Sequence, residues 1–467
     1  MAYSPATRRA QELPSATLAD GLSEELLTLR FKALWRAFKA EHFAFIAISL
    51  YLVFEYVKPE TAYPALAIVP WVRLCLLTAL GGMFADKLRD TRSSVVSVLL
   101  VLFLLHSMLS AAFAYEPAYS FSKLDIFLLW VIIYFLITTL VSTERRLYLF
   151  FAVYLLCNLK MSQFGFLSWA HRGFTFASWG LTGAGWYRNS GEFGMQMSMF
   201  FAYTLCLAFF LRQYWTGWRK WLMYFMPFSA IACVLGSSSR GAIVGSLAVL
   251  FYLSMFTKNK FKAWIASAVA IGIAYFFMPP EFLARFHSAG EDATSLSRLF
   301  YWSKAREMMA AHPVFGAGYY NWVPYYRDHY FDPVLYWRVE ECHNTYLQLG
   351  AELGVLGLAL FVALILACFV VNYQSERLCR RPGFEFLRGL SMGMNAAGIG
   401  LVLASTFLTA YFMPNYWIHF ALTVVISKVV RKKIAAAANP VASVAGPPEP
   451  QGRSAFPQYG PRHRIPS

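Results

Sequence analysis

The sequence CHNTYLQLGAELGVLGLALFVALILACFVVN, residues 342–372, decides how this chain folds because it joins a long polar segment to an apolar helix. A helix that crosses a membrane needs roughly 20 mostly apolar residues, and residues 345–372 exceed that length. The segment before it, from about Met278 to His343, is the only long polar interruption in a chain of successive apolar segments. We therefore expect membrane helices on both sides of one large polar loop.

Composition supports the same fold class. The 467-residue chain is 58% hydrophobic and only 14% charged, whereas a soluble globular chain has about 25% charged residues. This predicts an all-α polytopic membrane protein. Residues 1–28 are polar and lack the apolar core of a cleavable signal peptide, so the first apolar helix is expected to stay in the mature protein. The seven cysteines have neither C-x-x-C nor metal-binding spacing and are expected to pack as small hydrophobic side chains.

About twelve apolar segments are candidate membrane spans. They are 42–57, 63–83, 94–115, 125–142, 147–163, 193–211, 219–236, 241–257, 263–278, 345–372, 389–412 and 415–430. This count predicts a cytoplasmic N-terminus with an amphipathic interfacial helix (1–40), spans one to nine (41–278), a large periplasmic loop containing helices (279–343), spans ten to twelve (344–433) and a disordered cytoplasmic tail (434–467). The interfacial helix is expected over 23–40, and the main loop helix over 294–311.

The distribution of Lys and Arg supports this topology. Every loop on the side of the N-terminus is basic, whereas the short loops on the other side hold almost no positive charge. Cytoplasmic loops are enriched in Lys and Arg, so both termini are predicted to be cytoplasmic, and the net charge of +16 reflects topology rather than nucleic-acid binding. Three segments that are predicted to lie on the side of the membrane opposite the termini nevertheless contain arginine: 164–192, the 236–241 turn and 279–343. Their charges need another explanation.

Two of these segments place arginine beside glycine and polar residues. Arg188 lies in Trp186-Tyr187-Arg188-Asn189-Ser190-Gly191-Glu192, and Arg240 lies in Ser237-Ser238-Ser239-Arg240-Gly241 between two apolar helices. Hydroxyls, backbone N–H groups and a helix N-terminus around a guanidinium group suit a phosphate-like anion. The alternatives are an interfacial arginine for Arg188 and a structural turn, with arginine capping carbonyl groups or pairing with lipid headgroups, for Arg240.

The long loop adds a third arginine, an aromatic run and a histidine. Arg298 lies on the expected helix with Trp302 one turn away, and Tyr319, Tyr320 and Trp322 begin a run rich in aromatic residues that continues to Trp337. Aromatic rings either stack on sugars or lie in the headgroup belt. His343 directly precedes a helix, where imidazole can accept a proton near neutral pH, although a lone histidine is more often packed or capping. No metal-binding motif is present, although the adjacent Glu340 and Glu341 keep a metal site as an alternative.

In this order, the motifs resemble one family. Arg188, Ser238-Ser239-Arg240-Gly241, Arg298, the turn His312-Pro313-Val314-Phe315-Gly316-Ala317-Gly318 and the stretch from His343 through Glu352-Leu353-Gly354 look like the bacterial O-antigen ligase and O-antigen polymerase superfamily. The resemblance implies a GT-C-like, metal-independent glycosyltransferase that has no cofactor and uses an undecaprenyl-diphosphate-linked glycan. It implies that Arg188, Arg240 and Arg298 hold the diphosphate and that His343 is catalytic, either as the base on the acceptor hydroxyl or as a polar aid to the leaving group. Ser239, Tyr319, Tyr320 and Trp322 are further candidate substrate contacts.

Four functions are consistent with these features. The leading one is an O-antigen ligase-like transfer of glycan to lipid A core or another acceptor hydroxyl on the periplasmic face of the bacterial inner membrane. The others are polymerisation of lipid-linked repeat units, protein O-oligosaccharyl transfer, and transport or flipping of a lipid-linked substrate. Transporters place ionisable residues in mid-membrane, whereas here only Arg73, Lys160 and Glu352 come near. This favours an enzyme.

Overall fold

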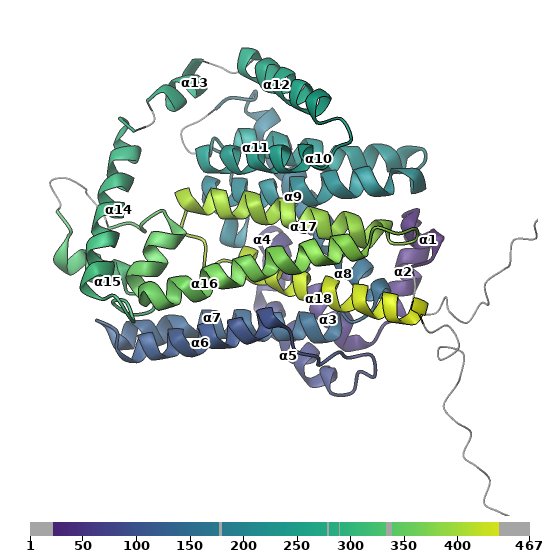
Figure 1. Ribbon diagram of the computed structural model, residues 1–467, viewed down its shortest axis with the longest axis horizontal. Coiled ribbons are helices and arrows are strands. Elements are labelled where there is room, and N and C mark those ends of the chain that lie inside the picture. The colour runs from purple at the N-terminus through teal and green to yellow at the C-terminus, as the bar shows by residue number, and fades with distance from the viewer. Residues whose placement is uncertain (1–21, 177–179, 278–279, 289, 333–338, 439–467) are drawn as a thin grey trace, which may run out of the picture.

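The computed structural model describes residues 22–176, 180–277, 280–288, 290–332 and 339–438, and every regular element in these ranges is a helix (Figure 1). The helices before the turn at 237–239 are α1 (Glu24–Leu27), α2 (Phe31–Lys39), α3 (Phe43–Leu52), η2 (Val53–Val57), α4 (Pro59–Ala62), η3 (Pro64–Ile68), α5 (Trp71–Met83), α6 (Val95–Ala112), α7 (Pro117–Leu140), α8 (Glu144–His171), η4 (Gly185–Tyr187), α9 (Ser190–Leu211), η5 (Arg212–Tyr214) and α10 (Trp218–Gly236). Those after it are α11 (Arg240–Ser254), α12 (Lys260–Phe277), α13 (Pro280–His287), α14 (Ala293–Ala311), α15 (Trp322–His329), α16 (Thr345–Leu378), α17 (Glu385–Ala404), η6 (Ser405–Phe407) and α18 (Pro414–Ala438).

The all-helical fold is confirmed, and each of the twelve expected spans overlaps a helix, although 63–83 is divided between η3 and α5 and 389–412 extends beyond η6. By length and composition, six helices in the described ranges can cross a membrane: α6, α7, α8, α9 with η5, α16, and α17 with η6. Three more, α3 with η2, α5 and α11, are apolar but shorter. The chain is therefore a membrane protein, while the count of twelve spans and the side on which each loop lies remain predictions.

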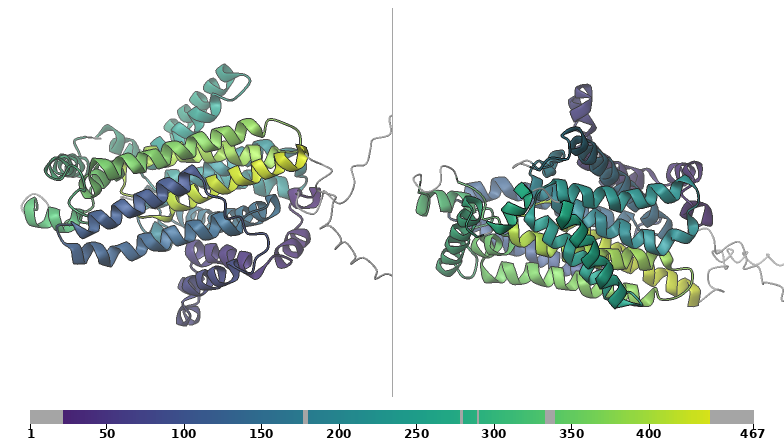
Figure 2. Two further views of the ribbon diagram at one scale, coloured as in Figure 1. Left: turned by 60° about the horizontal axis from the view of Figure 1, so that its bottom comes forward. Right: turned by 90° about the horizontal axis from the view of Figure 1, so that it is seen from above.

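The long helices form one bundle with α9 and α17 packed together near its centre (Figure 1). The helices α10 and α11 lie against α9, and α16 packs against α6, α17 and α18. The helix α12 lies at the edge of the bundle beside α11 (Figure 2). Because α9, α11, α14 and α16 all begin at the same end of the bundle, their N-termini are brought close together there.

The N-terminal segment differs from the single interfacial helix expected over 23–40. It forms α1 and α2, with a break at Thr28–Arg30 where Leu29 has a left-handed φ of 55°. In α2 the rings of Phe31 and Trp35 are exposed, as expected for a helix that lies on a membrane surface. At the other terminus α18 continues to Ala438, so the predicted tail begins as helix; residues 1–21 and 439–467 lie outside the described ranges.

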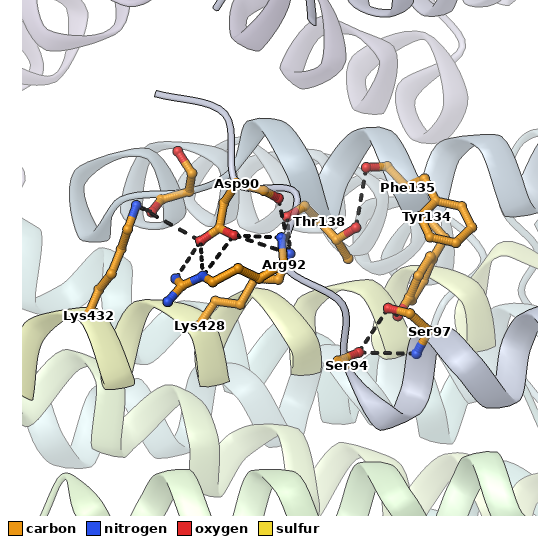
Figure 3. Close-up of polar contacts among 10 residues, drawn as sticks. Asp90, Arg92, Ser94, Ser97, Tyr134, Phe135, Thr138, Lys428 and Lys432 are labelled. Atoms are coloured by element: carbon orange, nitrogen blue, oxygen red, sulfur yellow. Dashed lines mark hydrogen bonds and ion pairs between the residues drawn. The ribbon is translucent and has the colours of Figure 1, made fainter. Parts of the chain in front are cut away.

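The end of the bundle that holds α1, α2 and the end of α18 is tied together by buried carboxylates. Asp90, in the connection between α5 and α6, accepts hydrogen bonds from the Arg92 guanidinium group, and Lys428 and Lys432 lie within 3.9 Å (Figure 3). The Lys428 ammonium group also donates to the backbone oxygens of Asp90 and Thr138, at the C-terminal end of α7. Burial alone would raise the pKa of Asp90, but the hydrogen bonds from Arg92 and the nearby positive charges lower it to about 2.

A second buried cluster lies at the same end. Arg146, in the first turn of α8, donates to Glu41 at 2.7 Å and to Asp86 at 2.6 Å, and all three side chains are almost completely buried. Several basic residues whose position could be explained by membrane topology alone therefore also form ion pairs with acidic residues of the fold. A buried charge is tolerated only when it is paired in this way.

Candidate functional site

A cavity of about 210 Å³ lies at the opposite end of the bundle, where the candidate arginines meet. The first turns of α9 and α11 form two of its walls, Ser288 with the start of α14 a third, and the end of α17 with η6 a fourth. Its lining residues are Asn189, Ser190, Gly191, Ser238, Ser239, Arg240, Gly241, Ala242, Ser288, Asp292, Thr294, Arg298, His343, Ala404, Phe407 and Leu408. Segments that are far apart in the chain therefore share one polar cavity.

Three helices begin at this cavity with a capping side chain in its lining. Asn189 accepts a hydrogen bond from the N–H of Gly191 in α9, Ser239 from that of Ala242 in α11, and Asp292 from that of Ser295 in α14. A fourth helix, α16, begins two residues after His343, with Asn344 as its cap. Because a helix N-terminus carries a partial positive charge and free N–H groups, this arrangement favours an anion.

The Ser237-Ser238-Ser239 turn is held tightly against its surroundings. Ser238 has a left-handed φ of 54°, and the N–H of Leu181 donates to the oxygen of Gly236 at 3.0 Å. A Cβ atom on Gly180 would lie 2.0 Å from the oxygen of Ser237, so only glycine allows this close approach. The glycine-rich stretch before Arg188 therefore fixes the turn that presents Arg240.

Arg240 forms an ion pair with Asp292. One guanidinium nitrogen lies 2.9 Å from the Asp292 carboxylate and the other donates to the Ser295 hydroxyl at 3.1 Å. Burial alone would raise the pKa of Asp292, but hydrogen bonds from Arg240 and Ser295 lower it to about 2. Asp292 thus holds a negative charge against Arg240, at the place where we expect the site to bind the anionic group of a ligand.

Arg298, which lies in the second turn of α14, is the second arginine of the cavity. Its Nε is buried and has no hydrogen-bond partner within the described ranges. Burial and the nearby positive charge of Arg240 lower the pKa of the Arg298 guanidinium group. A bound anion would stabilise this second positive charge beside Arg240, because the anion would offset both the desolvation and the repulsion.

His343 lines the same cavity immediately before the Asn344 cap. Its φ is 55°, a left-handed conformation in which histidine is more often found than most non-glycine residues. The imidazole Nε2 lies 3.6 Å from the Glu340 carboxylate.

The helix that follows His343 is divided into two pieces at Gly354. Gly354 has φ 69° and ψ −176°, so residues 345–353 form a half-helix that leaves the axis of the rest of α16. The turn 312–318 packs into this break. The N–H groups of Val355, Ala317 and Gly318 donate to the backbone oxygens of Pro313, Ala351 and Glu352 at 2.8, 2.9 and 3.0 Å.

Two glycines make this contact possible. A Cβ on Gly316 would lie 2.1 Å from the carbonyl carbon of Glu352, and a Cβ on Gly354 would lie 2.3 Å from the oxygen of Val314. The turn 312–318 and the stretch Glu352-Leu353-Gly354 are thus two sides of one joint, which we call the 316/354 joint. It sets the direction of the half-helix that carries His343 at its start.

A buried carboxylate, Glu352, reinforces the joint. It accepts hydrogen bonds from the backbone N–H of Trp322 at 3.1 Å, from the Gln348 amide at 3.2 Å and from the Tyr411 hydroxyl. Gln348 continues the network to Glu341, whose pKa is raised by burial. In the sequence, Glu352 was noted as an ionisable residue in an apolar helix and as part of the stretch that carries the family resemblance, but not as a structural carboxylate. That rare position was the signal of its structural role.

The structure brings four of the predicted site residues together: Ser239, Arg240, Arg298 and His343. Asn189 and Asp292, which also line the cavity, were not predicted; their signal was the position of a capping residue before an expected helix. Within the described ranges, no group of three or more His, Cys, Asp and Glu side chains is placed to hold a metal ion.

The other four predicted residues lie outside the lining of the cavity. Arg188 is exposed and directly precedes the lining residue Asn189. Tyr319 and Trp322 are fully buried in packing contacts, and Tyr320 packs against Phe412. Tyr336 and Trp337, the last part of the aromatic run, lie outside the described residues. Contact of these side chains with a substrate stays a prediction.

The sequence was compared with known families and proteins. Residues 225–362 match the family model described as O-Antigen ligase, a range that includes Arg240, Arg298, both sides of the 316/354 joint and His343. The match confirms the resemblance to the O-antigen ligase superfamily over this part of the chain, and members of this family are ligases and polymerases of the glycosyltransferase type. No curated protein matches the chain significantly.

Proposed function

We propose that this protein transfers a glycan from undecaprenyl diphosphate to the hydroxyl group of an acceptor glycan, with lipid A core as the leading acceptor. The observation that carries the proposal is the cavity in which Arg240, Arg298 and the first turns of three helices surround one space beside His343. Such a space suits a diphosphate, because guanidinium groups and helix N-termini both bind phosphate oxygens.

The proposed reaction is a single displacement at the anomeric carbon. The acceptor oxygen bonds to C1 of the sugar, the bond from C1 to the diphosphate oxygen breaks, and the acceptor proton passes to the imidazole of His343. Negative charge develops on the diphosphate as it leaves, so Arg240 and Arg298 stabilise the transition state more than the ground state. The Glu340 carboxylate lies 3.6 Å from the imidazole that receives this proton.

The proposal needs no metal ion, since the two arginines supply the positive charge that a divalent cation would otherwise provide. We also propose that the protein lies in the bacterial inner membrane, with both termini in the cytoplasm and the cavity on the periplasmic face. The buried basic clusters at the end of α18 and the cavity at the other end of the bundle support this orientation. Activity that is lost on chelation and restored by a divalent cation would contradict the metal-free mechanism.

The decisive experiment replaces site residues in a deletion strain. His343→Asn is preferable to alanine because asparagine tolerates the left-handed φ of this position. His343→Asn and Arg240→Gln are expected to abolish glycan transfer, whereas His171→Asn and Arg327→Gln, exposed residues outside the cavity, are expected to keep it. Normal surface glycan with either site variant would exclude the proposed mechanism.

The same strain separates a ligase from a polymerase, which would use the same diphosphate site. Uncapped lipid A core together with lipid-linked polymer indicates a ligase. Surface glycan limited to single repeat units indicates a polymerase. Unchanged lipopolysaccharide with loss of glycan from periplasmic proteins would instead indicate a protein O-oligosaccharyltransferase.

A further inference from the structure

A second cavity, of about 910 Å³, lies at the end of the bundle opposite the candidate active site. Its walls come from α9, α11, α12 and α17, and they include the apolar side chains of Phe209, Phe210 and Leu253. The volume falls in the range of roughly 300–1,000 Å³ that is usual for ligand sites. We call this cavity the α9/α11/α17 groove.

The rim of the groove is basic. Arg212 and Lys258 are exposed there and have no carboxylate partner among the residues the structure describes. Arg388 and Arg380 share a single carboxylate, Glu376. Four cations around one anion leave the rim with a net positive charge, although the walls beneath it are apolar.

The charged and apolar parts are in direct contact. The guanidinium group of Arg212 lies 5.5 Å from the ring centre of Phe209, and that of Arg388 lies 5.2 Å from the ring centre of Phe210. Each arginine therefore covers an aromatic ring that lines the groove and still presents N–H groups to the rim. A molecule that fits must have an anionic group joined to an apolar chain.

We infer that the α9/α11/α17 groove binds one anionic diacyl phospholipid, with its phosphate at Arg212, Lys258 and Arg388 and an acyl chain between the helices. Basic pockets between membrane helices recognise anionic headgroups by this chemistry. The polyprenyl diphosphate donor is not the occupant. The 22 residues of α9 separate the groove rim from the candidate active site by roughly 30 Å, at about 1.5 Å per residue, which is the thickness of a bilayer core.

The test measures lipid retention on the purified full-length protein by native mass spectrometry in detergent, with phosphatidylglycerol as the probe. Phosphatidylcholine, polyprenyl phosphate and inorganic phosphate are the competitors. Wild-type protein is expected to keep one phosphatidylglycerol in preference to all three. Each basic side chain near an anionic headgroup contributes about a fivefold preference, so the double variant Arg212→Gln/Lys258→Gln is expected to lose about twenty-five-fold.

Matched variants separate this site from general surface binding. The double variant Lys87→Gln/Arg431→Gln removes two exposed charges at the same end of the bundle outside the groove and is expected to retain the lipid. Leu253→Trp fills the groove and is expected to expel the lipid, whereas Leu247→Trp, exposed elsewhere on α11, is not. Equal retention by both double variants would overturn the inference, and so would displacement of the phosphatidylglycerol by inorganic phosphate or by polyprenyl phosphate.

Discussion

Replacing Gly354 by alanine tests whether the 316/354 joint positions His343. The backbone at Gly354, with φ 69° and ψ −176°, is almost exclusive to glycine, and holding another residue there costs about 1–3 kcal/mol. The new Cβ would also lie 2.3 Å from the oxygen of Val314, which belongs to the packed backbone of the turn. The turn must move, and its three hydrogen bonds to α16, worth about 1 kcal/mol each, weaken or break.

The expected cost is therefore about 2–6 kcal/mol, a large part of the roughly 5–15 kcal/mol that stabilises a typical domain. We expect Gly354→Ala to lower the denaturant midpoint of the purified protein strongly and to fail to restore surface glycan in a deletion strain. The amount of variant in the membranes of the same strain is measured alongside the glycan, so that loss of His343 geometry is distinguished from loss of protein.

Substitutions at two other glycines distinguish the effect of backbone strain from that of a steric clash. Gly383 has φ 81°, and a Cβ added there would meet no atom within 4 Å, so Gly383→Ala is strained without a clash and is expected to cost about 1–2 kcal/mol and keep activity. Gly81 is helical and open, and Gly81→Ala is expected to stabilise α5 by up to about 1 kcal/mol. If Gly354→Ala behaved like Gly81→Ala in both assays, the joint would have no role in positioning His343.

Three further predictions concern other parts of the molecule. Asp90→Asn removes the carboxylate that pairs with Arg92. Because the pKa of Asp90 is lowered to about 2 in the folded protein, the wild type is expected to be more stable than the variant at neutral pH, and this difference in unfolding free energy should vanish as pH falls from about 4 to 2. A difference that grew on acidification would be inconsistent with this pairing. Thr345→Val deletes the hydroxyl that donates to Leu408 at 2.7 Å and is expected to cost about 1–3 kcal/mol in denaturant unfolding; an unchanged midpoint would show that the contact is not formed. Arg298→Lys keeps the charge but loses the planar fork, so we expect about a tenfold lower kcat/KM for the lipid-linked donor. An unchanged kcat/KM would place the diphosphate away from Arg298.

Much of the fold could be predicted from the sequence because a membrane imposes a single simple rule on it. Long apolar segments become helices, and each of the twelve expected segments overlaps at least one helix. The helix over 294–311 was predicted within one residue, since its polar flanks and cap at Asp292 are local signals. The break in the 23–40 helix was missed, because a single left-handed residue such as Leu29 has no distinct signal in composition or periodicity.

For the site, the sequence identified the charged residues but could not show what they face. Arg240, Arg298 and His343 were recognised by their chemistry, and they line one cavity. Asp292 was missed because its pairing with Arg240 joins residues from two distant helices. Trp322 was one of several candidate substrate contacts; its backbone N–H donates to Glu352 and its ring is buried, so its contact with a substrate stays a prediction. Aromatic composition alone does not distinguish a ring that packs the interior from one that meets a ligand.

The 316/354 joint changes how the motif residues around His343 should be interpreted. Glycines at 316 and 354 are needed for close backbone approach, and Glu352 is fully engaged by hydrogen bonds from Trp322, Gln348 and Tyr411. None of these groups lines the cavity, so their loss would displace the half-helix rather than remove a reacting group. Loss of activity on mutating them is therefore evidence about position, whereas loss at Arg240, Arg298 or His343 with an unchanged unfolding midpoint is evidence about chemistry. Only the combined measurement of activity and stability separates the two groups, because both lie in the same short stretches of sequence.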